Sequence, residues 1–146
     1  MNRLLIILTL IYMTSISTAC QRQSTVVTLS EDQLTLSDKP VILKPKNPLS
    51  RTNNSLSIRI HIKEVWSPEY PWKNILLQDG TEVSIKVVLF SDKGTPYHPI
   101  IIGAGDGIDI RFNDSIPKNE KIVKIVLSSS YPLTTRSIKW VNWNPK

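Results

Sequence analysis

The stretch Ser55-Leu-Ser-Ile-Arg-Ile-His-Ile-Lys63 decides the fold of this chain. Aliphatic residues at positions 56, 58, 60 and 62 alternate with polar residues. A repeat of two places the aliphatic side chains on one face and the polar side chains on the other, which predicts a β-strand with one buried face. Such strands are typical of antiparallel sheets, which can expose one side to water. Glu64 breaks the alternation before Trp66, so we expect a bulge or the end of the strand there.

Further segments of the same type follow, separated by turn sequences. They are residues 74–78, 82–90, 97–102, 108–112, 121–127 and 137–141. Asp79-Gly80 and Asp92-Lys-Gly-Thr-Pro96 are typical of tight turns. No segment after residue 37 has the period of a helix. About seven strands with frequent turns predict an all-β fold, an antiparallel β-sandwich that is immunoglobulin-like or jelly-roll-like, with a partly closed barrel as the alternative.

The N-terminal segment indicates that the chain is exported. Arg3 gives a positive start, residues 4–13 form an apolar run, and small and hydroxyl residues follow up to Cys20. This order is typical of a secretory signal peptide, with Ser17 and Ala19 at the small-residue positions before a cut between Ala19 and Cys20. The apolar run is too short for a membrane-spanning helix, which needs about 17 to 25 residues.

The residues Ser17-Thr-Ala-Cys20 resemble the lipobox of bacterial lipoproteins, in which an aliphatic residue, a small residue and Gly or Ala precede a Cys. They depart from that pattern at Ser17, where the family usually carries Leu. The resemblance implies that Cys20 is acylated, with more than one acyl chain for stable anchoring. Gln21 stands where Asp is the usual signal for retention at the inner membrane, which implies the outer membrane, with the protein facing the periplasm.

Cys20 is the only cysteine. An exported chain with one thiol forms no internal disulfide, and acylation would remove an exposed reactive group. The same residues also fit the ordinary signal peptidase, so the alternative is a soluble periplasmic or secreted protein that begins at Cys20. We expect a signal peptide at 1–19, a lipidated N-terminus and tether at 20–37, and a β-sandwich domain at 38–146.

Charge and export together limit the partners. Removal of residues 1–19 takes Arg3 from the 18 basic side chains and no side chain from the 12 acidic ones, which leaves a net charge of +5. Basic proteins often bind nucleic acid, but an exported chain rarely meets it, so we expect no nucleic-acid partner. We expect the membrane as a partner through the lipid anchor, and an envelope protein or a glycan as a further partner.

The glycine-rich stretch Gly103-Ala-Gly-Asp-Gly107 has the composition of a phosphate-binding loop. That chemistry needs a helix directly after the glycines, whereas residues 108–112 alternate as a strand. Oxygen ligands that calcium prefers are offered nearby by Asp106, Asp109, Asn113 and Asp114. The spacing is not that of an EF-hand, and Asp109 is expected to face solvent from the middle of its strand. We interpret the stretch as a hairpin whose glycines allow positive φ.

Other catalytic and metal-binding patterns are not found. His61 and His98 are expected at the surface, and no cluster supplies the three or four ligands of a zinc site. The chain has no Gly-x-Ser-x-Gly motif, and nothing in it singles out a carboxylate pair for glycoside hydrolysis. We expect no metal, no cofactor and no enzymatic activity.

Aromatic residues are the feature with binding potential. The segment Trp66-Ser-Pro-Glu-Tyr-Pro-Trp72 is aromatic-rich, and Trp140 and Trp143 lie near the C-terminus. Exposed rings in loops can stack on sugars or anchor a protein partner. Trp66 and Trp140 continue the buried parity of their strands and are expected in the core, whereas Trp72 and Trp143 either cap the ends of the sandwich or bind a ligand. The candidate ligand-binding residues are Trp66, Tyr70, Trp72 and Trp143.

The C-terminal segment, with the Ser128-Ser-Ser130 turn, Tyr131-Pro-Leu133 and Ile138-Lys-Trp140, is loosely similar to the last strands of carbohydrate-binding jelly-roll modules. This similarity implies a carbohydrate-binding or peptidoglycan-binding module with exposed Trp and Tyr. It is the alternative to our main hypothesis, a small lipid-anchored envelope protein that acts as a non-catalytic binding or assembly module.

Overall fold

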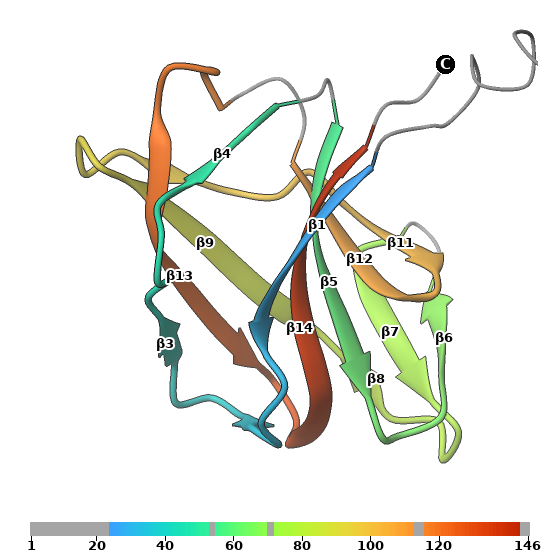
Figure 1. Ribbon diagram of the computed structural model, residues 1–146. Coiled ribbons are helices and arrows are strands. Elements are labelled where there is room, and N and C mark those ends of the chain that lie inside the picture. Colours follow the sequence, from blue (N-terminus) through green and yellow to red (C-terminus); the bar gives the residue numbers. More distant parts are fainter. Residues whose placement is uncertain (1–23, 53–54, 70–71, 113–115, 144–146) are drawn as a thin grey trace, which may run out of the picture.

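The computed structural model describes residues 24–52, 55–69, 72–112 and 116–143. Throughout these ranges the chain forms strands, turns and loops and no helix, so no helix that could cross a membrane occurs in them. Neighbouring strands pair in the antiparallel sense, and the two larger sheets enclose an apolar core (Figure 1). The prediction of an all-β antiparallel β-sandwich is confirmed.

The strands are short, apart from those that form the core. They are β1 (Thr25–Ser30), β2 (Thr35–Leu36), β3 (Val41–Leu43), β4 (Leu49–Ser50), β5 (Ser55–Ile62), β6 (Trp66–Glu69), β7 (Asn74–Leu77), β8 (Glu82–Val83), β9 (Ile85–Ser91), β10 (Pro96–Tyr97), β11 (Ile101–Gly105), β12 (Gly107–Phe112), β13 (Lys121–Ser129) and β14 (Leu133–Trp143).

Strand β5 is the central strand of the largest sheet, whose order is β1-β14-β5-β12-β11, with β2 paired to the start of β14. Its four aliphatic side chains, at positions 56, 58, 60 and 62, are all buried in the core, so the predicted alternation is confirmed. The strand ends at Ile62, which agrees with the bulge or strand end expected near Glu64. Lys63 still donates its backbone N–H to the carbonyl oxygen of Thr134 at 2.9 Å.

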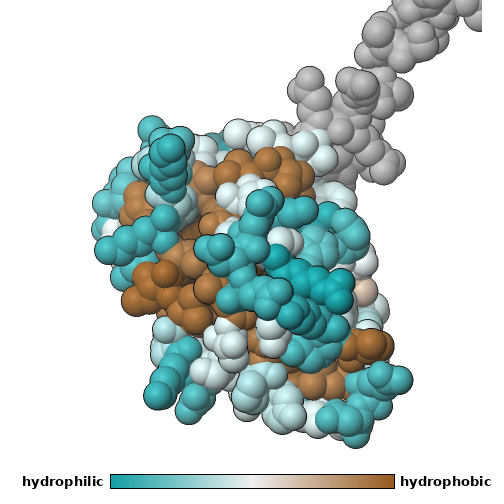
Figure 2. All heavy atoms as spheres, turned by 60° about the horizontal axis from the view of Figure 1, so that its bottom comes forward, coloured by the Kyte–Doolittle hydropathy of each residue, from teal (hydrophilic) through white to brown (hydrophobic). Residues whose placement is uncertain are grey.

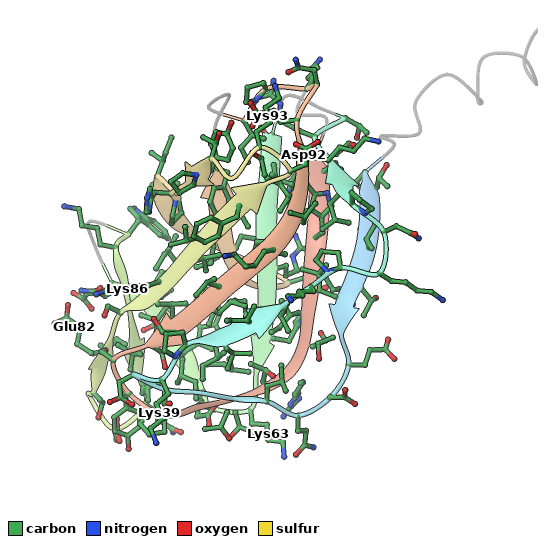
Figure 3. The ribbon with its side chains drawn as sticks, turned by 90° about the vertical axis from the view of Figure 1, so that its left-hand side faces the viewer. Lys39, Lys63, Glu82, Lys86, Asp92 and Lys93 are labelled. Carbon is green, nitrogen blue, oxygen red and sulfur yellow. The ribbon has the colours of Figure 1, made fainter. Side chains whose placement is uncertain are left out.

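The second sheet has the order β10-β9-β13-β3, with β4 also paired to β13. Its core face carries Ile85, Val87 and Leu89, which were predicted for one side of the 82–90 segment together with Val83 of β8, and all four residues are buried. Figure 3 looks onto the outer face of this sheet, with Asp92 and Lys93 at one end of the sandwich and Lys39 and Lys63 at the other. These lysines are exposed and spread over the rim, as expected of side chains that keep the surface solvated.

The segment predicted as one strand over residues 82–90 is divided at Ser84. The part before it, β8, pairs with β7 in a three-stranded sheet, and the part after it, β9, pairs with β13. Ser84 is held by Ser130, which accepts a hydrogen bond from the Ser84 N–H at 3.0 Å and donates its own N–H to the Ser84 carbonyl at 3.0 Å. Val83 and Ile85 on either side both face the core, so the alternation continues through the break.

The two predicted turns and the glycine hairpin are present. Gly80 and Gly94 have positive φ in the turns after β7 and β9. Strands β11 and β12 form a hairpin that closes at Asp106, with Gly105 opposite Gly107. The strands therefore extend further into the glycine-rich stretch than expected.

The paired part of the chain begins earlier than the expected domain boundary at residue 38. Strands β1 and β2 lie within the stretch 20–37, which we expected to be a tether, but both pair with β14. The physical reason is that β14 is eleven residues long and its edge is completed by the β-prone run from Thr25. Residues 20–23, including Cys20, lie outside the described residues.

Candidate functional site

The structure separates the aromatic residues that the sequence grouped as candidates. Trp140 is buried in the core, as predicted. Trp66 is half-buried and packs against the core cluster. Trp72 and Trp143 are exposed. Tyr70 lies outside the described residues.

Trp72 and Trp143 do not form one binding platform. Trp143 ends β14, and Trp72 lies beyond β11 at the other side of the same sheet, where its carbonyl oxygen accepts a hydrogen bond from the N–H of Ile102 at 3.0 Å. Strands β5, β12 and β11 lie between them. With strands about 4.8 Å apart, four such steps separate the two residues by about 19 Å across the sheet.

Trp72 has a left-handed backbone, with φ of 62°. This conformation is unusual for a bulky side chain and costs about 1 to 3 kcal/mol. Hydrogen bonds hold it on both sides, because the Trp72 N–H donates to the carbonyl of Glu69 and the Trp72 carbonyl accepts from Ile102. An exposed tryptophan kept in a strained conformation is a reason to look for a function at this position.

A shallow hollow of about 260 Å³ lies beside Trp72. It is lined by Trp72, Lys73, Ile85, Pro99, Ile100, Ile101 and Ile102. Ile100 and Ile101 are exposed at the start of β11, so apolar side chains and one basic side chain surround the hollow, whose walls expose polar and apolar surface in similar amounts. Apolar surface of this kind can accept the apolar side chains of a partner. We call Trp72, Ile100 and Ile101 the β11-edge site.

The isoleucines of the β11-edge site have a signal in the sequence. Three consecutive isoleucines, at positions 100–102, cannot all face one side of a strand, because successive side chains point to opposite faces. Of the three, only Ile102 is buried in the core.

A larger hollow of about 360 Å³ lies at the end of the sandwich where β5 ends and β14 begins. It is lined by Glu64, Val65, Leu77, Gln78, Asp79 and Tyr131. Figure 2 turns this end towards the viewer and shows apolar residues in separate patches between hydrophilic side chains. The walls of this hollow expose a larger share of apolar surface than those of the hollow beside Trp72, although Gln78 and Asp79 belong to its lining.

Trp143 belongs to a polar network on the outer face of the β5 sheet. Its indole N–H donates to the hydroxyl oxygen of Ser57 at 2.9 Å, and the Arg59 guanidinium lies 4.9 Å from the centre of its ring. Arg59 donates in turn to both carboxylate oxygens of Asp109, at 2.7 and 3.2 Å. This hydrogen bond raises the pKa of Arg59 above its ordinary value, against the lowering effect of burial. The network fixes the ring of Trp143 and uses its only donor.

Asp109 was expected to face solvent, and this expectation is wrong. It lies on the polar face of β12, opposite Arg59, but is only 1% exposed. Arg59 covers it from the next strand. Gly105 leaves room on the other side, because a Cβ there would lie 3.1 Å from the Asp109 carboxylate.

The calcium ligands considered for the same hairpin do not come together. Asp109 is used by Arg59, and the Asp106 side chain points outward and is 88% exposed. Asn113 and Asp114 lie outside the described residues. Within the ranges that the structure describes, no three metal-binding side chains gather around one point.

His61 is half-buried and not a free surface residue, whereas His98 is exposed as expected. The Nδ1 atom of His61 lies 2.8 Å from the Ser137 hydroxyl, and Nε2 lies 3.8 Å from the Asp106 carboxylate. Serine, histidine and aspartate are the residue types of a hydrolytic triad. In a triad the acid is buried and hydrogen-bonded to the ring, which does not hold for Asp106.

A second polar cluster joins β10 to the loop before β13. Tyr97 donates its hydroxyl to Glu120 at 2.7 Å, and Lys93 Nζ lies 3.5 Å from the other carboxylate oxygen. The Tyr97 hydroxyl lowers the pKa of Glu120, and burial together with this carboxylate raises the pKa of Tyr97. The cluster fastens the end of the sandwich that carries the turn after β9.

No protein-family model matches this chain, and a comparison with curated proteins gives no match. The function is therefore argued from the surface of the chain and its N-terminal sequence.

Proposed function

We propose that this chain is a small exported protein of the cell envelope, anchored through acyl chains on Cys20 and facing the periplasm. Its β-sandwich acts as a non-catalytic module that binds a protein partner at the β11-edge site. The observation that carries the binding role is the exposed apolar surface of Trp72, Ile100 and Ile101 around one hollow. The signal-peptide pattern and the lipobox resemblance around Cys20 support the export and the anchor.

A polypeptide fits this surface better than a glycan. Sugar sites combine an aromatic ring with several polar side chains that reach the hydroxyls, whereas the ring of Trp72 is accompanied by four isoleucines, a proline and a single lysine. Aromatic and aliphatic anchors in a central apolar patch are typical of protein interfaces.

The anchor would hold the module close to the membrane. Cys20 is separated from Thr25, the first residue of β1, by five residue steps. Five residues span at most about 18 Å when fully extended. The partner of the β11-edge site would therefore be a protein at or near the same membrane surface.

The alternative of a carbohydrate-binding or peptidoglycan-binding module rests on Trp143. Its ring is exposed and held by Arg59, so the ring face away from Arg59 could stack on a sugar. Binding of soluble peptidoglycan fragments that is lost in Trp143→Ala and retained in Trp72→Ala would favour this alternative.

The anchor is tested by labelling cells with a clickable palmitate analogue. The unmodified chain should take up the label and sediment with membranes, and Cys20→Ser should lose both. Gln21→Asp serves as the matched variant, because it should keep the label and move the protein to the inner-membrane fraction. Label that persists in Cys20→Ser would refute acylation at this residue and leave the soluble periplasmic alternative.

The binding site is tested by a photo-crosslinking amino acid placed at Ile100. Ile42 on β3 is a matched control position, because the residues Ile100 and Ile42 are 58% and 57% exposed and β3 belongs to the other large sheet. Crosslinks to an envelope protein should form from position 100, disappear in Trp72→Ala, and be absent from position 42. Equal crosslinking from both positions would contradict a site at the β11 edge.

A further inference from the structure

Strand β1 is the least covered strand of the large sheet. Its first four residues are exposed, which includes both faces of the strand, with Val26 50% and Val27 38% exposed. In the described part of the chain it pairs with β14 alone, from Thr25 opposite Asn142 to Ser30 opposite Ile138. Only its end is anchored inward, where Leu29 packs against the core.

The other edges of the two larger sheets, β10, β3 and β11, carry features that hinder pairing with another chain. Strand β10 has two residues and contains Pro96. Strand β3 has three residues and lies between Pro40 and Pro45. At β11 the outward N–H of Ile102 is occupied by the carbonyl of Trp72. Short length, proline and coverage are the usual protections of an edge strand.

Strand β1 has none of these protections over its first four residues, and its bulge lies after them, at Leu29. The sequence Thr25-Val-Val-Thr-Leu-Ser30 contains no charge, no proline and no glycine, and Val and Thr favour strands. An edge strand presents unpaired N–H and C=O groups on its free side, and a long uncharged edge is a template for another strand.

We infer that β1 pairs in the antiparallel sense with β1 of a second copy of this chain, so that two large sheets become one continuous sheet. A second copy fits because an uncharged strand can face itself without placing like charges opposite each other, and Val and Thr make favourable cross-strand pairs. Such a contact uses the same surface twice and closes after two molecules. The inference goes beyond the proposed function and does not depend on acylation or on the β11-edge site.

The test uses the mature chain from residue 20 with Cys20→Ser, which removes both the anchor and the only thiol. Sedimentation velocity from about 1 to 100 µM should show a monomer–dimer equilibrium. Val26→Lys should weaken the dimer about tenfold, because the two-fold symmetry places the substitution in the interface twice. Ile42→Lys is the matched control, with a similar exposed aliphatic side chain on β3, and should leave the equilibrium unchanged.

Thr28→Lys is the second variant, in case Val26→Lys disturbs folding, and near-ultraviolet circular dichroism checks the fold of both. A chain that remains monomeric up to about 100 µM overturns the inference. A dimer that resists both lysine substitutions also overturns it, as does a dimer that Ile42→Lys weakens equally. Because the test is made without the anchor, its failure leaves the proposed acylation and partner binding untouched.

Discussion

Asp109→Ala should destabilise the fold strongly, although Asp109 lies on the polar face of its strand. The carboxylate is 1% exposed and accepts two hydrogen bonds from Arg59, whose side chain is 13% exposed. Removing one partner of a buried ion pair leaves the other charge buried and costs about 3 to 5 kcal/mol. Because Arg59 keeps some contact with water, we expect about 3 kcal/mol for Asp109→Ala and a similar loss for Arg59→Ala.

A double-mutant cycle separates the pair from its surroundings. The variant that carries both substitutions should lose about 3 to 4 kcal/mol, well below the sum of the single losses, because no unpaired charge remains. Urea unfolding followed by tryptophan fluorescence gives these free energies, provided that the m-value is unchanged. Asp106→Ala is the control, since this carboxylate is 88% exposed in the turn between β11 and β12 and should contribute less than about 0.5 kcal/mol to stability. A coupling energy below about 0.5 kcal/mol would show that the pair is solvated and our reasoning is wrong.

Further outcomes follow from single residues. Gly107→Ala should lower stability by about 2 kcal/mol in thermal unfolding, because Gly107 has φ of 142° and a Cβ would lie 3.1 Å from the carbonyl oxygen of Ile60. Ile58→Ala should cost about 3 to 4 kcal/mol in urea unfolding, because this fully buried side chain would leave a cavity. Tyr97→Phe should reduce the loss of thermal stability at low pH. The lowered pKa of Glu120 stabilises the fold above the ordinary pKa of 4.5, and this stability is lost as the pH falls through the lowered pKa. The Tyr97 hydroxyl is the largest cause of the lowering. An unchanged pH profile in that variant would contradict the assignment.

The part of the fold that follows from periodicity could be predicted from the sequence. The aliphatic residues of β5 all face the core because a repeat of two admits one arrangement once one face is buried. The division at Ser84 could not be predicted, because Val83 and Ile85 keep the alternation while the strand changes sheets. The partner of a strand is set by contacts with residues far away in the sequence, and the periodicity of the strand holds no information about these contacts.

The candidate site could be predicted only in part. Trp72 was a candidate from its position in an aromatic loop, and the structure adds its strained backbone and its isoleucine neighbours. Trp143 was grouped with it because both rings lie outside the regular alternation, but sequence distance does not measure separation across a sheet. The burial of Asp109 depends on Arg59, fifty positions earlier in the chain, and on the missing side chain of Gly105.

The division at Ser84 also determines what surrounds the hollow beside Trp72. Ile85, which forms part of its wall, is the first residue of β9 after the chain leaves the small sheet. Trp72 and Lys73, directly before β7, form another part of the same wall. Because Ile75 and Val83 of the small sheet belong to the same apolar core as Ile85, the hollow lies where two sheets are packed together.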